Sequence, residues 1–68
     1  MNWVKDTEEN KPNTLIEVIV CDKYGETTSA FWSDENGHWY DLKNDIVKNV
    51  VYWTRLPFPP QELIDKLN

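Results

Sequence analysis

The sequence contains one cysteine and one histidine, which excludes most chemistry that depends on those side chains. Cys21 has no disulfide partner within the chain, which fits a reducing compartment and makes the cytoplasm the expected location. Cys21 and His38 leave at least two ligands of a tetrahedral zinc site to be supplied by carboxylates. They fall on separate predicted strands with another strand between them, which would keep them apart as nucleophile and base. We therefore expect no catalytic site, no metal and no cofactor.

Long apolar runs and basic charge are also scarce. The longest apolar stretch, 15–21, is interrupted by Glu17 and is far shorter than the roughly 20 residues of a transmembrane helix. No basic segment precedes it, as a secretory signal would require. Twelve acidic residues against seven basic ones give a net charge of −5, which disfavours direct contact with nucleic acid and favours a basic partner. We expect a cytoplasmic protein that contacts neither membrane nor nucleic acid.

The sequence does contain a dense aromatic and proline-rich stretch at 50–60, Val-Val-Tyr-Trp-Thr-Arg-Leu-Pro-Phe-Pro-Pro. Its β-branched and aromatic residues favour a strand over 50–56, which ends there because Pro57 cannot donate to a ladder. The prolines then predict a stiff, polyproline-like tail. This tail is either an intramolecular strap over the tryptophans or a ligand for an aromatic groove on another protein.

Alternation and turn residues predict further strands. A strand over 15–21 would place Ile16, Val18 and Val20 on one face. Turns at 22–25 and at Asn36-Gly37 would join it to strands over 26–32 and 38–41. The polar segment 6–14 has the composition of an exposed, mobile loop, and 42–49 is interpreted as a loop although its residues also fit a turn or a helix.

These elements predict one domain over 1–68 with a mainly β fold. The strands form a small antiparallel meander of three to four strands, with closure into a small barrel as an alternative, followed by a short helix over 61–67. A domain this small buries only about 60% of its unfolded surface, so its nine aromatic residues must supply much of the core. The predicted structural core consists of Ile16, Val18, Val20, Val51, Trp53 and Leu56.

A small sheet with one short helix cannot cover every large ring. Each aromatic side chain can belong to the core, but a ring left exposed and rimmed by acids would be typical of a protein-binding patch. The candidate protein-binding surface consists of Trp32, Trp39, Tyr40, Tyr52 and Phe58.

Two segments also resemble a known family. The segment 52–60, Tyr-Trp-Thr-Arg-Leu-Pro-Phe-Pro-Pro, resembles the closing motif His-Trp-Met-Pro-Leu-Pro-x-Pro-Pro of domain-of-unknown-function family 551, which is encoded mainly by phages and prophages. The opening Trp-Val-Lys-Asp at 3–6, Pro12 and the apolar run 15–20 are similar to that family's Trp-Ile-x-Val-x-Asp start, early proline and first strand. The family has no agreed activity, so the resemblance implies a fold and a phage or mobile-element origin.

The sequence therefore favours a non-enzymatic, phage- or prophage-derived binding protein that acts stoichiometrically on a host or viral protein in the host-cell cytoplasm. One alternative is an acidic anti-defence inhibitor, anti-restriction or anti-CRISPR, that blocks a nucleic-acid-binding site. A second is a small-ligand-binding protein with a pocket between the sheet and the terminal helix. The oligomeric state stays open, because free strand edges favour self-pairing and the acidic surface opposes it.

Overall fold

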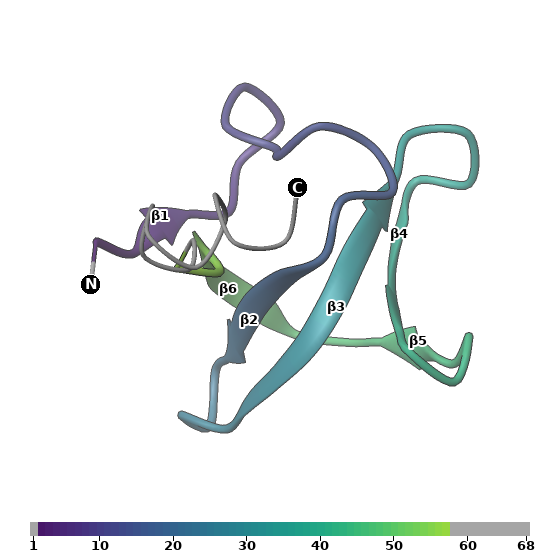
Figure 1. Cartoon of the computed structure of the whole chain (residues 1–68). Helices are drawn as coiled ribbons and strands as arrows, with labels where there is room; N and C mark the ends of the chain where they lie inside the picture. Colours follow the sequence, from purple (N-terminus) through teal and green to yellow (C-terminus); the bar gives the residue numbers. More distant parts are fainter. Residues whose placement is uncertain (1, 58–68) are drawn as a thin grey trace, which may run out of the picture.

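The computed structural model describes residues 2–57, which form a single six-stranded antiparallel sheet (Figure 1). The strands are β1 (Val4–Lys5), β2 (Val18–Asp22), β3 (Thr27–Ser33), β4 (His38–Asp41), β5 (Ile46–Val47) and β6 (Val50–Arg55). The mainly β prediction is confirmed, and no helix occurs within these described residues. The helix predicted over 61–67 lies outside them.

The strand order is β1-β6-β2-β3-β4-β5, so the meander prediction holds only for β2 to β5. β6 returns to pair with β2, in the register Val20↔Trp53, and β1 adds to its other side. In a flat sheet β5 and β6 would lie four strand spacings apart, about 19 Å. The link from Val47 to Val50 can span at most about 11 Å. The sheet must therefore curl, which brings β5 close to the start of β6.

The long strand β3 makes this curl possible because its two halves have different partners. Its first half pairs with β2, from Cys21↔Thr27 to Val18↔Ala30, and its second half pairs with β4, from Ala30↔Asp41 onward. Ala30 alone is paired on both sides. Figure 1 shows β3 running diagonally across the molecule between these two sets of partners.

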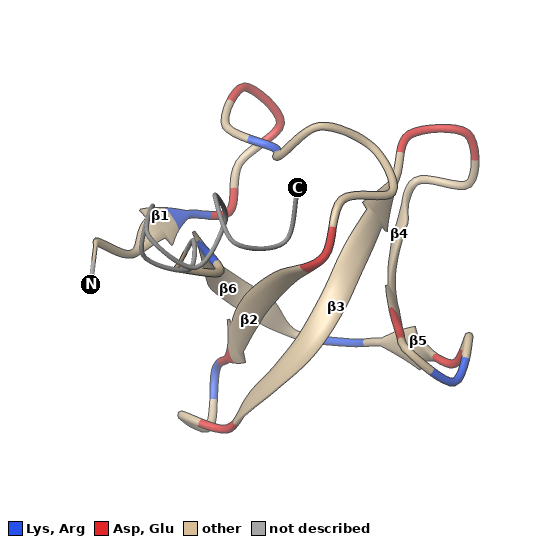
Figure 2. Ribbon diagram, viewed as in Figure 1, with Lys and Arg blue, Asp and Glu red and all other residues tan. Residues whose placement is uncertain are grey.

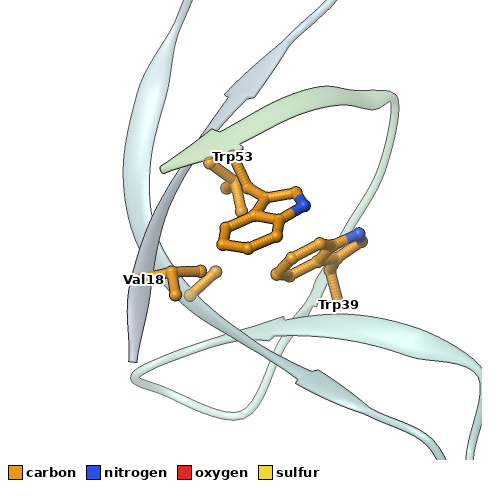
Figure 3. Close-up of a cluster of buried hydrophobic side chains, with 5 residues drawn as sticks. Val18, Trp39 and Trp53 are labelled. Atoms are coloured by element: carbon orange, nitrogen blue, oxygen red, sulfur yellow. The ribbon is translucent and has the colours of Figure 1, made fainter. Parts of the chain in front are cut away.

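The core lies inside the curl and is built around two indoles. Trp39 from β4 and Trp53 from β6 are 4% and 5% exposed, and Figure 3 shows their rings approaching each other beside Val18. The buried hydrophobic residues are Val18, Val20, Ala30, Trp39 and Trp53. Three predicted core residues, Val18, Val20 and Trp53, therefore lie in the core, whereas Val51 and Leu56 are half-buried.

Ile16 does not belong to the core, contrary to the prediction, because β2 begins only at Val18. Leu15 has a φ of 63°, and this left-handed conformation breaks the extended backbone that the alternation assumed. Ile16 is consequently 47% exposed. The strand predicted over 15–21 is wrong in its first three residues.

The segment 6–14 is a structured cover rather than the predicted mobile loop. The backbone N–H of Asp6 donates to the carbonyl of Val51 at 2.9 Å, and the indole Nε1 of Trp53 donates to the carbonyl of Asn10 at 2.7 Å. Pro12 is buried. A buried indole needs an acceptor for its N–H, and the polar atoms of this segment supply it.

Two turns in the sheet share one structure. In the turns beginning at Asp22 and at Asp41, Oδ1 of the aspartate accepts the backbone N–H groups two and four residues later. The residue three positions later, Gly25 or Asn44, has a φ of 86° or 68°. The Asp22 turn confirms the hairpin predicted at 22–25. The Asp41 turn joins β4 to β5 within the segment that was interpreted as a loop.

Candidate functional site

The outer face of the sheet carries a pair of aromatic rings that the core does not use. Phe31 and Tyr40 are cross-strand neighbours on β3 and β4, and their rings stack with centroids 6.0 Å apart and an interplanar angle of 24°. Both side chains are half-buried. The alternation of β3 and β4 places them opposite Trp32 and Trp39, which face inward.

Leu15 and this aromatic pair line a hollow on the outer face of the sheet. The hollow has a volume of about 210 Å³ and is lined by Leu15, Phe31, Ser33, Asn36, Tyr40 and Asn44; we call it the outer hollow. The side chain of Leu15 is 66% exposed. Its position is fixed by its backbone N–H, which donates to the carbonyl of Trp32 at 2.8 Å.

The conformation of Leu15 is costly, which makes its exposure informative. An L-residue other than glycine, asparagine or aspartate rarely adopts a positive φ, and the left-handed conformation costs about 1–2 kcal/mol. A solvent-exposed leucine recovers little of this cost by burial in the free protein. Backbone strain of this kind concentrates at binding and switch sites.

The predicted binding residues do not form one surface. Tyr40 lies in the outer hollow. Tyr52 is 43% exposed on β6, but β2 and β3 separate its strand from that of Tyr40. Trp32 is half-buried, with Nζ of Lys11 at 4.0 Å from its ring centroid. Phe58 lies outside the described residues.

Trp39 was predicted on the binding surface and lies instead in the core. Its Nε1 donates to Oδ2 of Asp6 at 3.1 Å, and the other oxygen of that carboxylate forms an ion pair with Lys11. The ring also packs edge-on against Trp32, with centroids 5.5 Å apart. Because segment 6–14 covers these rings, neither is available as a flat exposed surface.

The alternation analysis missed Leu15 and Phe31 as surface residues. Both fall within predicted strands, over 15–21 and 26–32, and an alternating pattern does not distinguish the inner face of a sheet from its outer face when both carry aromatics. The segment Pro12-Asn13-Thr14 before Leu15 is a local signal of a turn there, since proline and asparagine favour turns.

His38 and Cys21 are far from forming a pair. They lie on β4 and β2 with β3 between them, as predicted. The His38 ring is edge-on to the Tyr40 ring, and the two ring centroids are 6.4 Å apart. Within residues 2–57 no three His, Cys, Asp or Glu side chains are grouped as metal ligands would be. No helix in this described part is long and apolar enough to cross a membrane.

Comparison with known proteins gives no relative: no family model, curated protein or solved structure matches this chain. The indications of function are therefore the outer hollow and the distribution of charge around the sheet.

Proposed function

We propose that this chain is a non-enzymatic binding protein of phage or prophage origin, which acts stoichiometrically on a host or viral protein. The observation that carries the proposal is the outer hollow, where the strained and exposed Leu15 lies beside the stacked rings of Phe31 and Tyr40. If a partner buried the Leu15 side chain and the edges of the Phe31 and Tyr40 rings, the hydrophobic free energy gained would offset the conformational cost at Leu15.

Polar groups around the outer hollow suit a protein contact. Ser33, Asn36 and Asn44 line it beside the apolar side chains, and Asp34 and Glu35 lie in the adjoining loop. Apolar anchors with a polar rim are typical of protein interfaces.

The charge distribution gives less support to the anti-defence alternative. Figure 2 shows the acidic residues at loops and strand ends, with lysines interspersed among them. A mimic of nucleic acid would need carboxylates spaced along one face as phosphates are. The outer hollow therefore supports a protein contact more directly than it supports mimicry of DNA.

The test is affinity capture from a bacterial lysate with the tagged full chain and two matched variants. Leu15→Asn removes the apolar side chain and keeps a residue that tolerates a positive φ. Tyr24→Asn is the control, because Tyr24 is also a large exposed side chain but lies outside the outer hollow. We expect the parent and Tyr24→Asn to recover the same partner at a fixed stoichiometry, and Leu15→Asn to lose it. Recovery of nothing at several salt concentrations, or equal recovery by all three, would contradict the proposal.

The proposed origin has its own test. If the gene derives from a phage or prophage, its neighbours in the genome should be phage genes. A location among conserved housekeeping genes in every genome that carries it would refute this part of the proposal.

A further inference from the structure

One stretch of β3 has a free edge. In an antiparallel ladder, consecutive residues direct their backbone N–H and C=O groups to opposite sides. The bond from the N–H of Asp22 to the carbonyl of Glu26, at 2.9 Å, fixes the alternation along the β2–β3 register. Thr28 and Ala30 therefore bond to β2, whereas Thr27 and Ser29 direct their N–H and C=O groups away from it.

Bonds at the other end of β3 agree with this assignment. The carbonyl of Trp32, on the same side as those of Thr28 and Ala30, accepts the N–H of Leu15 at 2.8 Å. β4 occupies the opposite side as far as Ala30↔Asp41, and this register places Leu42 opposite Ser29 before the chain turns away at Asp41. Within residues 2–57 the outward groups of Thr27 therefore face no strand, and those of Ser29 face only Leu42, which belongs to the turn and not to a strand.

The space beside this edge is open. A hollow of about 380 Å³ is lined by Thr28, Ser29, Asp41, Leu42, Lys43 and Asp45. A neighbouring hollow of about 280 Å³ reaches Thr27, Asp22 and Glu26. The exposed side chain of Leu42 provides an apolar contact in the first hollow. An extended segment placed there would meet both the unpaired backbone and a side-chain surface.

The charge around the edge selects the kind of segment. The two hollows are lined by the carboxylates of Asp22, Glu26, Asp41 and Asp45 and by the ammonium groups of Lys43 and Lys48. Four negative charges against two positive ones leave the edge acidic. Among the described residues the one ion pair joins Asp6 to Lys11, so none of these four carboxylates is neutralised by an ion pair there.

We infer that the Thr27–Ser29 edge binds an extended, basic segment of the partner protein by adding it as a strand to β3. Such an addition gives backbone hydrogen bonds for affinity and alternate side-chain contacts for specificity. A second copy of this chain would fit the edge less well, because it would place the same acidic groups opposite each other. The inference rests on the proposed function, since it names the chemistry of the partner segment that this binding protein takes.

The inference can be tested without the natural partner. The probe is a short, end-blocked peptide of alternating lysine and valine, titrated into the isotopically labelled full chain and followed by the amide signals in NMR spectra. We expect saturable shifts centred on Thr27 and Ser29, and slower hydrogen exchange at both amides. The same peptide N-methylated at alternate residues keeps its charge but cannot pair with the edge, so it should bind at least about tenfold more weakly. A glutamate–valine peptide should not bind.

A protein variant provides a second measurement. Thr27→Pro removes an outward N–H at the first residue of a strand, a place where proline is tolerated. We expect this variant to fold and to lose most of its affinity for the lysine–valine peptide. Thr28→Pro, by contrast, should lower the melting temperature, since the N–H of Thr28 bonds to β2. If Thr27→Pro fails to fold, the N-methylated peptide still decides the question.

Three results would overturn the inference: no saturable shift at millimolar peptide, equal binding of the N-methylated peptide, or concentration-dependent shifts at the edge without peptide. The last would indicate a second copy of the chain as the occupant. If the peptide titration fails but capture from a lysate still depends on Leu15, this inference is wrong and the proposed function stands. If the titration succeeds but capture fails, the edge binds basic segments and the proposed function is wrong.

Discussion

The indole Nε1 of Trp39 donates a hydrogen bond to Oδ2 of Asp6 at 3.1 Å, which joins residues 33 positions apart in the chain. The same carboxylate holds Lys11, whose Nζ lies 4.0 Å from the ring centroid of Trp32. The backbone N–H of Asp6 also bonds to β6 through the carbonyl of Val51. A single aspartate thus ties the cover segment 6–14 to the buried rings and to the sheet.

Asp6→Ala should consequently destabilise the protein more than its place in a polar loop suggests. The substitution leaves the Trp39 N–H and the Lys11 ammonium without their acceptor, and an unsatisfied buried donor costs about 1–3 kcal/mol. In a domain of this size, each kcal/mol corresponds to a melting-temperature shift of roughly 4–8 °C. Glu9→Ala, at an exposed position of the same segment, is the control for thermal melting by circular dichroism. Equal melting of the two variants would show that the Asp6 contacts contribute nothing.

Trp53→Ala should be the most damaging single truncation. Trp53 is 5% exposed, pairs with Val20 and Val4, and donates its indole N–H to Asn10. Removal of a buried tryptophan side chain costs about 3–5 kcal/mol, which is comparable with the net stability of a small domain. We expect a largely unfolded protein at 37 °C. Tyr52→Ala, at the exposed neighbouring position, should melt close to the parent, and a Trp53→Ala shift below about 3 °C would contradict burial of this ring.

The two matching turns allow a comparison at equivalent positions. Gly25 and Asn44 both have positive φ, and apart from Gly25 and its two chain neighbours no heavy atom of the described residues lies within 4 Å of a Cβ placed on Gly25. Gly25→Ala should therefore cost only the backbone term, about 1–2 kcal/mol. Asn44→Gly should change stability by less than about 0.5 kcal/mol, because asparagine already tolerates this conformation. Thermal melting of both variants measures the difference, and an unchanged Gly25→Ala would mean that the first turn can adopt another conformation.

The sequence predicts the hairpins well because their determinants are local. In one turn Asp22 supplies the side-chain acceptor and Gly25 the positive φ. In the other, the Ser33 hydroxyl accepts the backbone N–H of Asn36, and Gly37 has a φ of 69°. The return of β6 to β2 is not local. Nor do two-residue strands such as β1 and β5 show any periodicity. The meander prediction failed at these points.

The candidate site was harder to predict than the hairpins, for two physical reasons. In the structure Trp32 pairs with Trp39 and Phe31 with Tyr40, but alternation along a strand does not tell which of its two faces packs against the core. The deciding factor is segment 6–14, whose polar composition is typical of an exposed loop although its oxygens accept the N–H groups of buried indoles. The positive φ of Leu15 has no sequence signature, because glycine and asparagine are the residues expected there.

Leu15→Gly should separate stability from binding. Glycine adopts a positive φ without the steric cost of about 1–2 kcal/mol, although it loses about 0.5–1 kcal/mol more conformational entropy on folding. The net effect is a melting temperature equal to or several degrees above that of the parent, together with loss of partner capture, since the apolar anchor of the outer hollow is gone. Tyr24→Gly is the matched control: Tyr24 is also exposed, lines neither the outer hollow nor the hollows beside the β3 edge, and has no positive φ, so glycine there brings the entropy cost without relief of strain. We expect Tyr24→Gly to melt below the parent and to retain the partner. If Leu15→Gly melts below Tyr24→Gly, the Leu15 side chain stabilises the free protein by packing, and the strain at Leu15 then gives no support to a binding site.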